Sequence, residues 1–415
     1  MTTEKVDVLV IGAGPSGTVA ASIIHQAGYS VKIVEKLKFP RFVIGESLLP
    51  RSMEALEEAG FIDAIKAKGF QEKYGAKFVK GNSVCDFTFK EQHTPGWNWT
   101  WQVTRADFDK TLADTVESMG VPVCYETTVT AIRFNGSDSV TTVEDIHGNK
   151  SEIAARFIVD GSGYGRVIPR LFNLEKSSNL QPRKALFAHT VDVRRSMADE
   201  PNRITAVVHK PGTWIWIIPF STGVTSLGFV GDPSFFAAYP GTPEQQYRAL
   251  LEAEPYTRER FRDVELVFEP RILESWSATT DKFYGEGFVL TGNVTEFLDP
   301  IFSSGVTLAC VSAQTAAKLV IRKLKGEAVD WDKEYMAPTM QGVNTFRSYV
   351  MAWYEGTLDK IFFSEEQRPE VKNQICSVLA GYVWDMSNPF VQHHDTALKR
   401  LARTIELTEI IKQDQ

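Results

Sequence analysis

The sequence predicts a mixed α/β fold built in two layers, an α+β arrangement that ends in a helical C-terminal region. Three observations support this prediction: an apolar strand that runs into a glycine-rich turn, a segment rich in β-branched and aromatic residues at about 186–231, and helical spacing beyond Lys325. With 415 residues, of which 43% are hydrophobic, the chain can bury one large core or two fused cores.

The first strand and its turn predict a Rossmann-like βαβ unit. Residues 6–11 are typical of a buried parallel strand, and they lead directly into Gly12, Gly14 and Gly17 and then into a helix. A second apolar strand ends at Glu35, where a carboxylate would meet a ribose hydroxyl. In such a unit the first glycine permits the tight turn, the second lets the backbone approach a pyrophosphate, and the third lets helix and strand pack closely. Because all these parts occur in register, we expect a dinucleotide cofactor rather than a plain strand-helix turn.

The elements that follow mix helix and strand. In chain order we expect a helix at 51–68, strands at 74–90 and 97–103, a helix from Arg105 to just before Gly120, a buried strand ending at Asp160-Gly161, and an antiparallel sheet at about 186–231. No internal repeat or low-complexity linker interrupts this order.

A candidate anion site lies where residues 297–306 lead into a long helix. The backbone N–H groups of Ser304, Gly305 and Val306 would open this helix, and a helix N-terminus presents unpaired donors and partial positive charge. Pro300 fixes the approach of the chain to this turn. An ordinary helix cap without a ligand is the alternative interpretation.

Composition and charge argue against several functions. The net charge of −7 comes without a concentrated basic stripe, so nucleic acid is not an expected partner. The four cysteines are far apart and no secretory signal precedes the first strand, so we expect reduced thiols and a cytoplasmic location. No uninterrupted apolar run reaches membrane-spanning length, and the histidines lack metal-ligand spacing, so we expect neither an integral membrane segment nor a metal site.

These residues together resemble the flavoprotein monooxygenases of the para-hydroxybenzoate hydroxylase fold. The resemblance rests, in chain order, on the glycine unit with Glu35, the loop at 45–50, Arg105 with Phe108 and Asp109, Asp160-Gly161, and Gly292-Asn293. Within that superfamily the chain is similar to the flavin-dependent halogenases, particularly those that act on phenols and pyrroles. Three segments carry this narrower resemblance: Trp214-Ile215-Trp216-Ile217-Ile218-Pro219, the run from Phe297 to Gly305 with Pro300 and Ser303, and residues 69–75 around Lys73.

The resemblance implies FAD as the cofactor, delivered in reduced form by a separate flavin reductase, with halide as a co-substrate. The residues it implies for FAD binding are Gly12, Gly14, Pro15, Ser16, Gly17, Glu35, Lys36, Arg41, Glu46, Ser47, Arg105, Asp160, Gly161, Gly292, Asn293, Pro300, Gly305 and Val306. It also implies Lys73, Phe302 and Ser303 as catalytic residues, Ser304 and Gly305 as halide-binding residues, and Trp214, Trp216 and Pro219 as a tunnel wall.

The tryptophan segment and Lys73 each have a plainer interpretation as well. Trp214, Trp216 and Ile218 alternate along a strand and could form only a buried face, whereas in the family this bulky wall is thought to keep the substrate from the flavin. A lysine is usually a solvated surface charge. Lys73 lies among aromatic neighbours, however, and an amine held in an apolar tunnel gains direction and a lower pKa. The resemblance implies that this amine holds or carries the oxidised halogen.

Phe302 and Asn293 depart from patterns found in the family. Phe302 occupies the place of the catalytic glutamate of tryptophan halogenases, which favours a phenol-like or pyrrole-like substrate, free or tethered to an acyl or peptidyl carrier protein. Asn293 stands where an aspartate is usual, and its amide offers a hydrogen bond but no charge.

The expected function is therefore that of an FAD-dependent oxidoreductase of secondary metabolism, a halogenase that uses reduced FAD, dioxygen and halide on a phenol-like aromatic substrate. Two alternatives share the fold: an aromatic hydroxylase, a monooxygenase that reduces its own flavin with NAD(P)H, and a geranylgeranyl-type prenyl-chain reductase that needs no oxygen. A flavin-bearing interaction protein without turnover is a third alternative, which only Asn293 suggests.

The elements divide into three expected parts. These are a discontinuous FAD-binding domain at 1–73, 102–180 and 281–325, an antiparallel β substrate domain at 74–101 and 181–280, and a helical C-terminal region at 326–415. The family resemblance covers most of residues 7–325 and does not extend to the C-terminal region.

Overall fold

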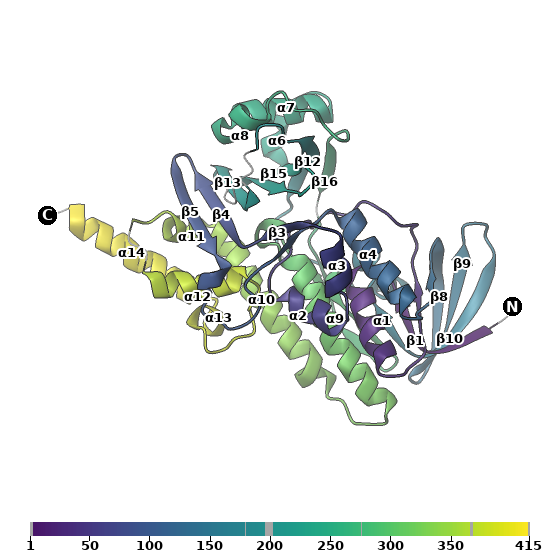
Figure 1. Ribbon diagram of the computed structural model, residues 1–415. Coiled ribbons are helices and arrows are strands. Elements are labelled where there is room, and N and C mark those ends of the chain that lie inside the picture. The colour runs from purple at the N-terminus through teal and green to yellow at the C-terminus, as the bar shows by residue number, and fades with distance from the viewer. Residues whose placement is uncertain (1–2, 179, 196–201, 275, 366–367, 414–415) are drawn as a thin grey trace.

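The computed structural model describes residues 3–178, 180–195, 202–274, 276–365 and 368–413, and it contains an eight-stranded and a seven-stranded sheet with helices packed on both (Figure 1). The eight-stranded sheet consists of β1 (Thr3–Ile11), β2 (Val31–Val34), β7 (Val123–Cys124), β8 (Thr127–Asn135), β9 (Asp138–Asp145), β10 (Lys150–Asp160), β18 (Tyr284–Gly285) and β19 (Phe288–Leu290). Its main path is β18-β19-β10-β1-β2-β7, and β8 and β9 branch from β10. The mixed α/β fold expected from the sequence is confirmed.

The alternation of side chains along β1 explains how this sheet is covered on both faces. Val8 and Val10 share a core with the helices α1 (Pro15–Gln26), α4 (Arg105–Ser118) and α9 (Ser304–Leu324). Leu9 and Ile11 point the other way and share a second core with Ile132 and Val143 of β8 and β9. Because β1 is buried on both faces, it is apolar throughout its C-terminal half, as expected for a central parallel strand.

The seven-stranded sheet runs in the order β16-β12-β15-β14-β13-β4-β5. Its strands are β4 (Gly75–Lys80), β5 (Ser83–Thr88), β12 (Lys184–Val191), β13 (Ile204–Lys210), β14 (Thr213–Pro219), β15 (Val224–Gly231) and β16 (Arg271–Glu274). The expected antiparallel pairing is confirmed among β12 to β15, whereas β13 pairs with β4 in parallel. Residues 196–201, inside the segment expected as sheet, lie outside the described residues.

Helices from different parts of the chain cover the two faces of the seven-stranded sheet. Ile215 and Ile217 of β14 face α6 (Pro233–Ala237), α7 (Pro243–Ala253) and α8 (Pro255–Phe261), which lie at the top of Figure 1. Trp214 and Trp216 face the opposite side and belong to the core shared with the C-terminal helices. The alternation expected for the tryptophan segment is therefore confirmed, and its tryptophans lie on the side toward the middle of the molecule.

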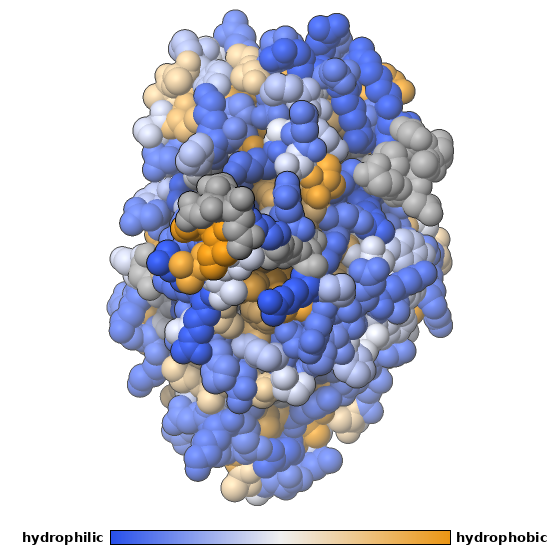
Figure 2. All heavy atoms as spheres, turned by 90° about the vertical axis from the view of Figure 1, so that its left-hand side faces the viewer, coloured by the Kyte–Doolittle hydropathy of each residue, from blue (hydrophilic) through white to orange (hydrophobic). Residues whose placement is uncertain are grey.

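The C-terminal region is helical, as expected. It contains the π-helical turn η6 (Asp332–Met336) and the helices α10 (Ala337–Tyr354), α11 (Thr357–Phe362), α12 (Pro369–Leu379), α13 (Pro389–Gln392) and α14 (Ala397–Gln413). The ring of Phe78 on β4 lies 5.7 Å from that of Trp353 and 4.7 Å from that of Phe362. These helices thus share a continuous aromatic core with the sheet. Figure 2 shows the face on this side of the molecule, which is mostly hydrophilic with hydrophobic groups gathered in a hollow near its centre.

Smaller elements complete the chain and correct two expectations. The helix expected at 51–68 is broken at Gly60, whose φ is +75°, into α2 (Ser52–Glu58) and α3 (Ile62–Ala67). The strand expected at 97–103 shortens to β6 (Thr100–Gln102), which pairs with β3 (Gln71–Lys73). The other short elements are η1 (Phe89–Glu91), η2 (Gly163–Gly165), α5 (Val167–Leu171), β11 (Glu175–Ser177), β17 (Ala278–Thr280), η4 (Gly292–Val294), β20 (Glu296–Phe297) and η5 (Pro300–Phe302).

Among the described residues, α9 is one helix whose length and apolar composition would allow it to cross a membrane. Of its most apolar stretch, 67% is buried inside the structure, where α9 contacts α1 and α2. This packing identifies α9 as a core helix of the fold.

Candidate active site

A cavity of 390 Å³ lies between the glycine-rich turn, the start of α9 and the tryptophan face of the seven-stranded sheet. Most of the predicted site residues line it: Gly12, Gly14, Pro15, Ser16, Glu35, Lys36, Arg41, Glu46, Ser47, Arg105, Gly161, Trp214, Trp216, Asn293, Pro300, Ser303, Gly305 and Val306. The fold thus brings together residues nearly three hundred positions apart. A pocket of this size, mostly apolar with a few polar groups, suits a large organic ligand.

The three glycines of the first turn divide into two kinds by their surroundings. A Cβ on Gly17 would lie 1.9 Å from the carbonyl oxygen of Gly12, and a Cβ on Gly12 would lie 2.7 Å from that of Gly161. Gly17 is therefore required by the close packing of α1 on the turn, and Gly12 by the close approach of the segment that follows β10. A Cβ on Gly14 would meet no atom closer than 3.5 Å, so Gly14 faces open cavity at the uncapped N-terminus of α1. This is where an anionic diphosphate would approach the backbone.

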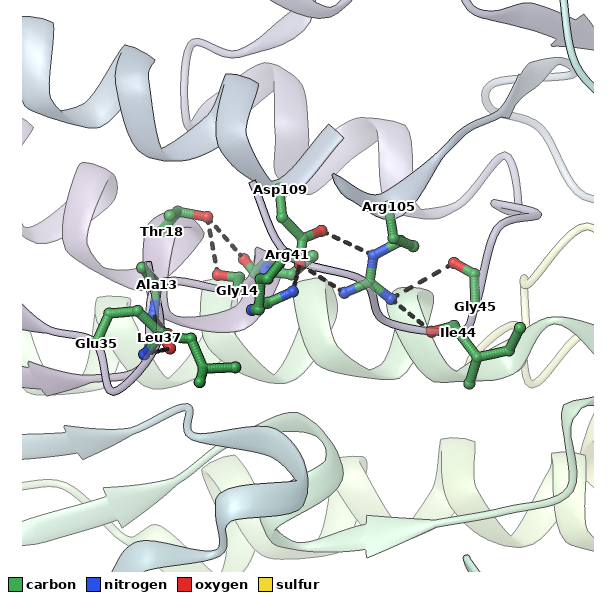
Figure 3. Close-up of polar contacts among 11 residues, drawn as sticks. Ala13, Gly14, Thr18, Glu35, Leu37, Arg41, Ile44, Gly45, Arg105 and Asp109 are labelled. Atoms are coloured by element: carbon green, nitrogen blue, oxygen red, sulfur yellow. Dashed lines mark hydrogen bonds and ion pairs between the residues drawn. The ribbon is translucent and has the colours of Figure 1, made fainter. Parts of the chain in front are cut away.

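Glu35 lies at the end of β2 and lines the same part of the cavity. One carboxylate oxygen accepts a hydrogen bond from the Ala13 amide and the other from the Leu37 amide, each at 2.9 Å (Figure 3). The carboxylate thereby ties the glycine-rich turn to the segment after β2. A carboxylate has about four lone-pair directions, so it can still accept a hydroxyl from a ribose.

A buried carboxylate joins two arginines beside the turn. Asp109, whose side chain has no solvent exposure, accepts hydrogen bonds from Arg105 through both oxygens at 2.7 and 2.9 Å and from Arg41 at 2.8 Å (Figure 3). Burial alone would lower the pKa of Arg105, but the adjacent Asp109 outweighs this and raises it. Arg105 also donates to the Ile44 carbonyl at 3.0 Å. Arg41 and Arg105 therefore stand fixed in the wall of the cavity, and a nitrogen of Arg41 lies 3.5 Å from the Cβ position of Gly14.

The start of α9 forms another polar part of the wall. Asp299 caps the turn η5 by accepting a hydrogen bond from the Ile301 amide at 3.1 Å, which agrees with its expected role as a turn former. Ser303 follows with φ +56°, and no side chain caps α9. The first turn of α9 contains no acidic residue. A Cβ on Gly305 would lie 3.9 Å from Oδ1 of Asn293, so this amide stands next to the exposed backbone.

Lys73 lies behind the cavity wall. Its side chain is 2% exposed, and its amine donates to Ser47 Oγ at 2.8 Å and to the Leu48 carbonyl at 2.7 Å. Burial lowers the pKa of Lys73 to about 7. Because Ser47 lines the cavity and Lys73 does not, one hydrogen-bonded side chain separates the amine from the cavity. The burial of this amine agrees with the expectation from the sequence, and its catalytic role stays a prediction.

Six other predicted residues lie outside the cavity wall. Three of them lie in tightly packed or turning backbone behind the cavity wall: Gly17, Gly292 and Ser304. Pro219 ends β14, and its carbonyl accepts a hydrogen bond from Gln102. The carboxylate of Asp160 accepts hydrogen bonds from the Ser162 and Ile168 amides, so it stabilises the backbone that follows Gly161. Phe302 is buried against Phe78, Tyr349 and Trp353.

Sequence reasoning missed several polar partners at the cavity. Asp109 belonged to the family pattern but was not expected to hold two arginines, although its position four residues after Arg105 on a helix is a signal for such a pair. His189 bonds to the cavity residue Glu46 at 2.7 Å, and Tyr354 bonds to Asp299 at 2.9 Å. These two pairs join residues 143 and 55 positions apart, and no local pattern in the sequence marks them.

Comparison with protein families matches residues 5–333 to the FAD binding domain family. The chain belongs to this family. It is 27% identical over 388 residues to the 1H-pyrrole-2-carbonyl-(peptidyl-carrier protein) brominase of Pseudoalteromonas luteoviolacea, covering 92% of this chain and 93% of that protein. It is also 31% identical over 330 residues to the tryptophan 2-halogenase of Chondromyces crocatus, covering 77% of this chain and 62% of that protein.

Solved structures agree with this assignment. A flavoprotein/dehydrogenase from Cytophaga hutchinsonii is 60% identical with a TM-score of 0.96, covering 98% of this chain and 100% of the other. A triple mutant of the flavin-dependent brominase Bmp2 is 25% identical with a TM-score of 0.83, covering 95% of this chain and 100% of the other. The expected fold and the resemblance to flavin-dependent halogenases are confirmed.

The residues of the cavity fit the cofactor of this family of FAD-binding proteins. The open backbone at Gly14, the positive charges of Arg41 and Arg105 and the carboxylate of Glu35 are what a diphosphate flanked by a ribose requires. The protein is therefore an FAD-dependent oxidoreductase.

Replacing Gly14 with valine should abolish FAD retention while leaving the chain folded, because the new side chain fills the space for the diphosphate while its Cβ meets no atom closer than 3.5 Å. Bound flavin per chain, measured by absorbance, should fall below about a tenth of the parent value, with an unchanged circular dichroism spectrum. The matched Gly17→Val variant should misfold, because its Cβ would collide with Gly12. Normal flavin content in Gly14→Val would contradict the assignment.

Lys73 should make the free energy of unfolding rise with pH above about pH 7. Below that pH the amine is charged in both the folded and unfolded chains, so the whole cost of burying the charge is present. As pH rises toward about 10.5, the folded chain holds a neutral amine while the unfolded chain still binds a proton, so the parent should gain about 1.4 kcal/mol per pH unit relative to Lys73→Met.

Urea unfolding between about pH 6 and pH 9 measures this difference. Lys68→Met, at an exposed position, is the control and should show no such slope. A parent and a Lys73→Met variant whose unfolding free energies stay parallel over this range would mean that the buried amine has an ordinary pKa.

Proposed function

We propose that this flavoprotein halogenates a small, phenol-like or pyrrole-like aromatic substrate. Reduced FAD, delivered by a separate flavin reductase, supplies together with dioxygen the oxidising equivalents that convert halide to hypohalous acid. The observation that carries the proposal is the placement of Lys73, which is buried, has a pKa of about 7 and lies one side chain behind the cofactor cavity. A reaction in which an oxidised halogen leaves the cofactor before it meets the substrate needs such a second group.

Halide binds, in this proposal, at the start of α9. The uncapped helix N-terminus presents the backbone amides of Ser304 and Gly305 and carries partial positive charge. No carboxylate in the first turn competes with an anion, and the neighbouring Asn293 is neutral where an aspartate would repel it. Ser303, in its left-handed conformation, turns the chain so that these amides begin the helix beside the cavity.

Lys73 receives the halogen and directs it to the substrate. Near neutral pH a substantial fraction of this amine is uncharged, so its lone pair can take the halogen from hypohalous acid, with loss of water, to form a haloamine. The haloamine nitrogen then gives the halogen to an aromatic carbon and regains the proton that this carbon loses. Alternatively, the charged form donates a hydrogen bond to hypohalous acid and orients it without a covalent step.

Aromatic side chains in and behind the cavity wall determine how close the substrate comes to the cofactor and which rings can react. Trp214 and Trp216 line the cavity as a bulky apolar face, which supports the exclusion of the substrate from the cofactor itself. Phe302 stands where a carboxylate would be needed for less activated rings, and it lies in an aromatic cluster with Phe78, Tyr349 and Trp353. Both features support an electron-rich ring as the acceptor.

The substrate is proposed to be free or carried on an acyl or peptidyl carrier protein, because the similar brominase and a chlorinase of Pseudomonas fluorescens act by name on a pyrrole held by a peptidyl-carrier protein. We place the reaction in the cytoplasm, which agrees with the four free cysteines.

Lys73→Ala should abolish halogenation while leaving FAD binding and the oxidation of reduced FAD by dioxygen intact, because the amine acts after the cofactor. Product formation from a panel of phenols with bromide, read by mass spectrometry, should fall at least about a hundredfold. Lys68→Ala should match the parent. A Lys73→Ala variant that brominates near the parent rate would reduce Lys73 to a structural residue.

Bromide should bind beside the Ser304 and Gly305 amides in crystals of the FAD-loaded protein, where anomalous scattering identifies it. With reduced FAD, dioxygen and bromide, phenols should be brominated ortho or para to the hydroxyl, and free tryptophan should react poorly. Bromide absent from this site, together with an oxygenated product and FAD reduction by NADPH alone, would establish an aromatic hydroxylase instead. Oxygen-independent reduction of a prenyl chain would establish the reductase, and no turnover with any of these substrates would favour an interaction protein.

A further inference from the structure

Tyr354 links one wall of the cavity to another. The indole N–H of Trp214 donates to the Tyr354 hydroxyl at 3.0 Å, and this hydroxyl donates in turn to Oδ2 of Asp299 at 2.9 Å. Trp214 belongs to the apolar wall, and Asp299 lies in the wall just before the proposed halide site. Tyr354 itself ends α10, in the C-terminal region that lies beyond the match to the FAD binding domain family.

The two ends of the link are buried, and Tyr354 between them is half-buried. Trp214 is 2% exposed and Asp299 is 3% exposed. The second oxygen of Asp299 accepts the Ile301 amide at 3.1 Å and so fixes the turn that leads to Ser303. The guanidinium of Arg183 lies 3.8 Å from the centre of the Tyr354 ring, which holds the ring from the outside. A single hydroxyl therefore sets the position of the tryptophan wall relative to the halide turn.

We propose that Tyr354 is a positioning residue for halogenation, which holds Trp214 and the Asp299 turn in register so that the halide site keeps its shape and its electrostatic potential. The proposal rests on the proposed function, because it assigns a role at the same halide site. Through Tyr354 the C-terminal helices would influence the reaction. None of their described residues lines the cavity.

The pH at which Asp299 ionises offers a way to measure the role of Tyr354. Burial raises the pKa of Asp299 to about 6, against the lowering effects of the hydrogen bonds from Tyr354 and the Ile301 amide and of the charge on Arg183. Above about pH 6 the ionised carboxylate stands close to the turn where an anion binds, so halide affinity should fall as pH rises through this range. Without the Tyr354 hydroxyl, the ionised form loses a hydrogen bond, so the pKa of Asp299 should rise further.

The test is a titration of the oxidised FAD-loaded protein with bromide, followed by flavin absorbance between about pH 5 and pH 8. In Tyr354→Phe we expect the midpoint to shift upward by about half a pH unit or more, because the ionised form of Asp299 loses a hydrogen bond. Below both midpoints, where Asp299 is neutral in parent and variant, bromide affinity should weaken about tenfold because the turn is no longer held, with unchanged flavin content. Tyr349→Phe is the matched control on the same helix, because the Tyr349 hydroxyl is buried without a hydrogen-bond partner in the described structure. It should titrate like the parent.

Two further variants keep the result interpretable. Asp299→Asn should bind bromide with no pH dependence in this range, and Trp214→Phe should weaken bromide while keeping the parent midpoint, because the Tyr354–Asp299 bond remains. These two variants test the proposal even if Tyr354→Phe does not fold. A parent that binds no bromide would overturn the proposed function. If the parent binds bromide and a folded Tyr354→Phe matches its affinity and midpoint, only the role of Tyr354 is overturned; if Tyr354→Phe does not fold, Trp214→Phe binding bromide as tightly as the parent does so instead.

Discussion

The buried carboxylate of Asp109 organises the cofactor end of the cavity. It has no solvent exposure and balances two arginines, and removing one partner from such a buried pair typically costs about 3–5 kcal/mol because an uncompensated charge remains. Arg105 also holds the carbonyl of Ile44, so the carboxylate fixes the loop that carries Ser47. Ser47 in turn accepts the hydrogen bond from Lys73. The place of the lysine amine therefore depends on an ion pair in a different part of the cavity.

The two sheets contribute different chemistry to the same space. The eight-stranded sheet and its helices bring backbone amides, a carboxylate and arginines, which suit a charged cofactor. The seven-stranded sheet brings tryptophans, and its other face is sealed by a separate core with α6 to α8. Because the polar and apolar walls come from separate layers, the apolar wall can differ in shape without disturbing the groups that hold the cofactor. The small β3–β6 sheet contacts both regions: Lys73 of β3 bonds to Ser47 and Leu48, and Gln102 of β6 bonds to Pro219 of the seven-stranded sheet.

The parts that were predictable are those encoded by local sequence. The βαβ unit, α4, α9 and the alternation of Trp214 and Trp216 follow from spacings of a few residues. Lys73 is buried as expected, but not by its neighbour in sequence Tyr74, which is exposed; the amine lies 5.5 Å from the ring of Phe89. The parallel pairing of β13 with β4 was not predictable, because side chains alternate in the same way in parallel and antiparallel strands. The contacts of Asp299 and His189 were also beyond prediction, since each partner is chosen by packing over long separations in the chain.

The spread of the cavity residues along the sequence has a consequence for biosynthesis. The wall draws on residues from Gly12 to Ala309, and Trp214 is held in place by Tyr354. At about 5–20 residues per second, a ribosome takes roughly 15–60 s to pass from the first of these wall residues to the last. During that interval the glycine-rich turn and the tryptophan face have emerged without their partners. Nascent chains are therefore expected to acquire flavin late in translation or after release, and to rely on chaperones to shield the aromatic strands until then.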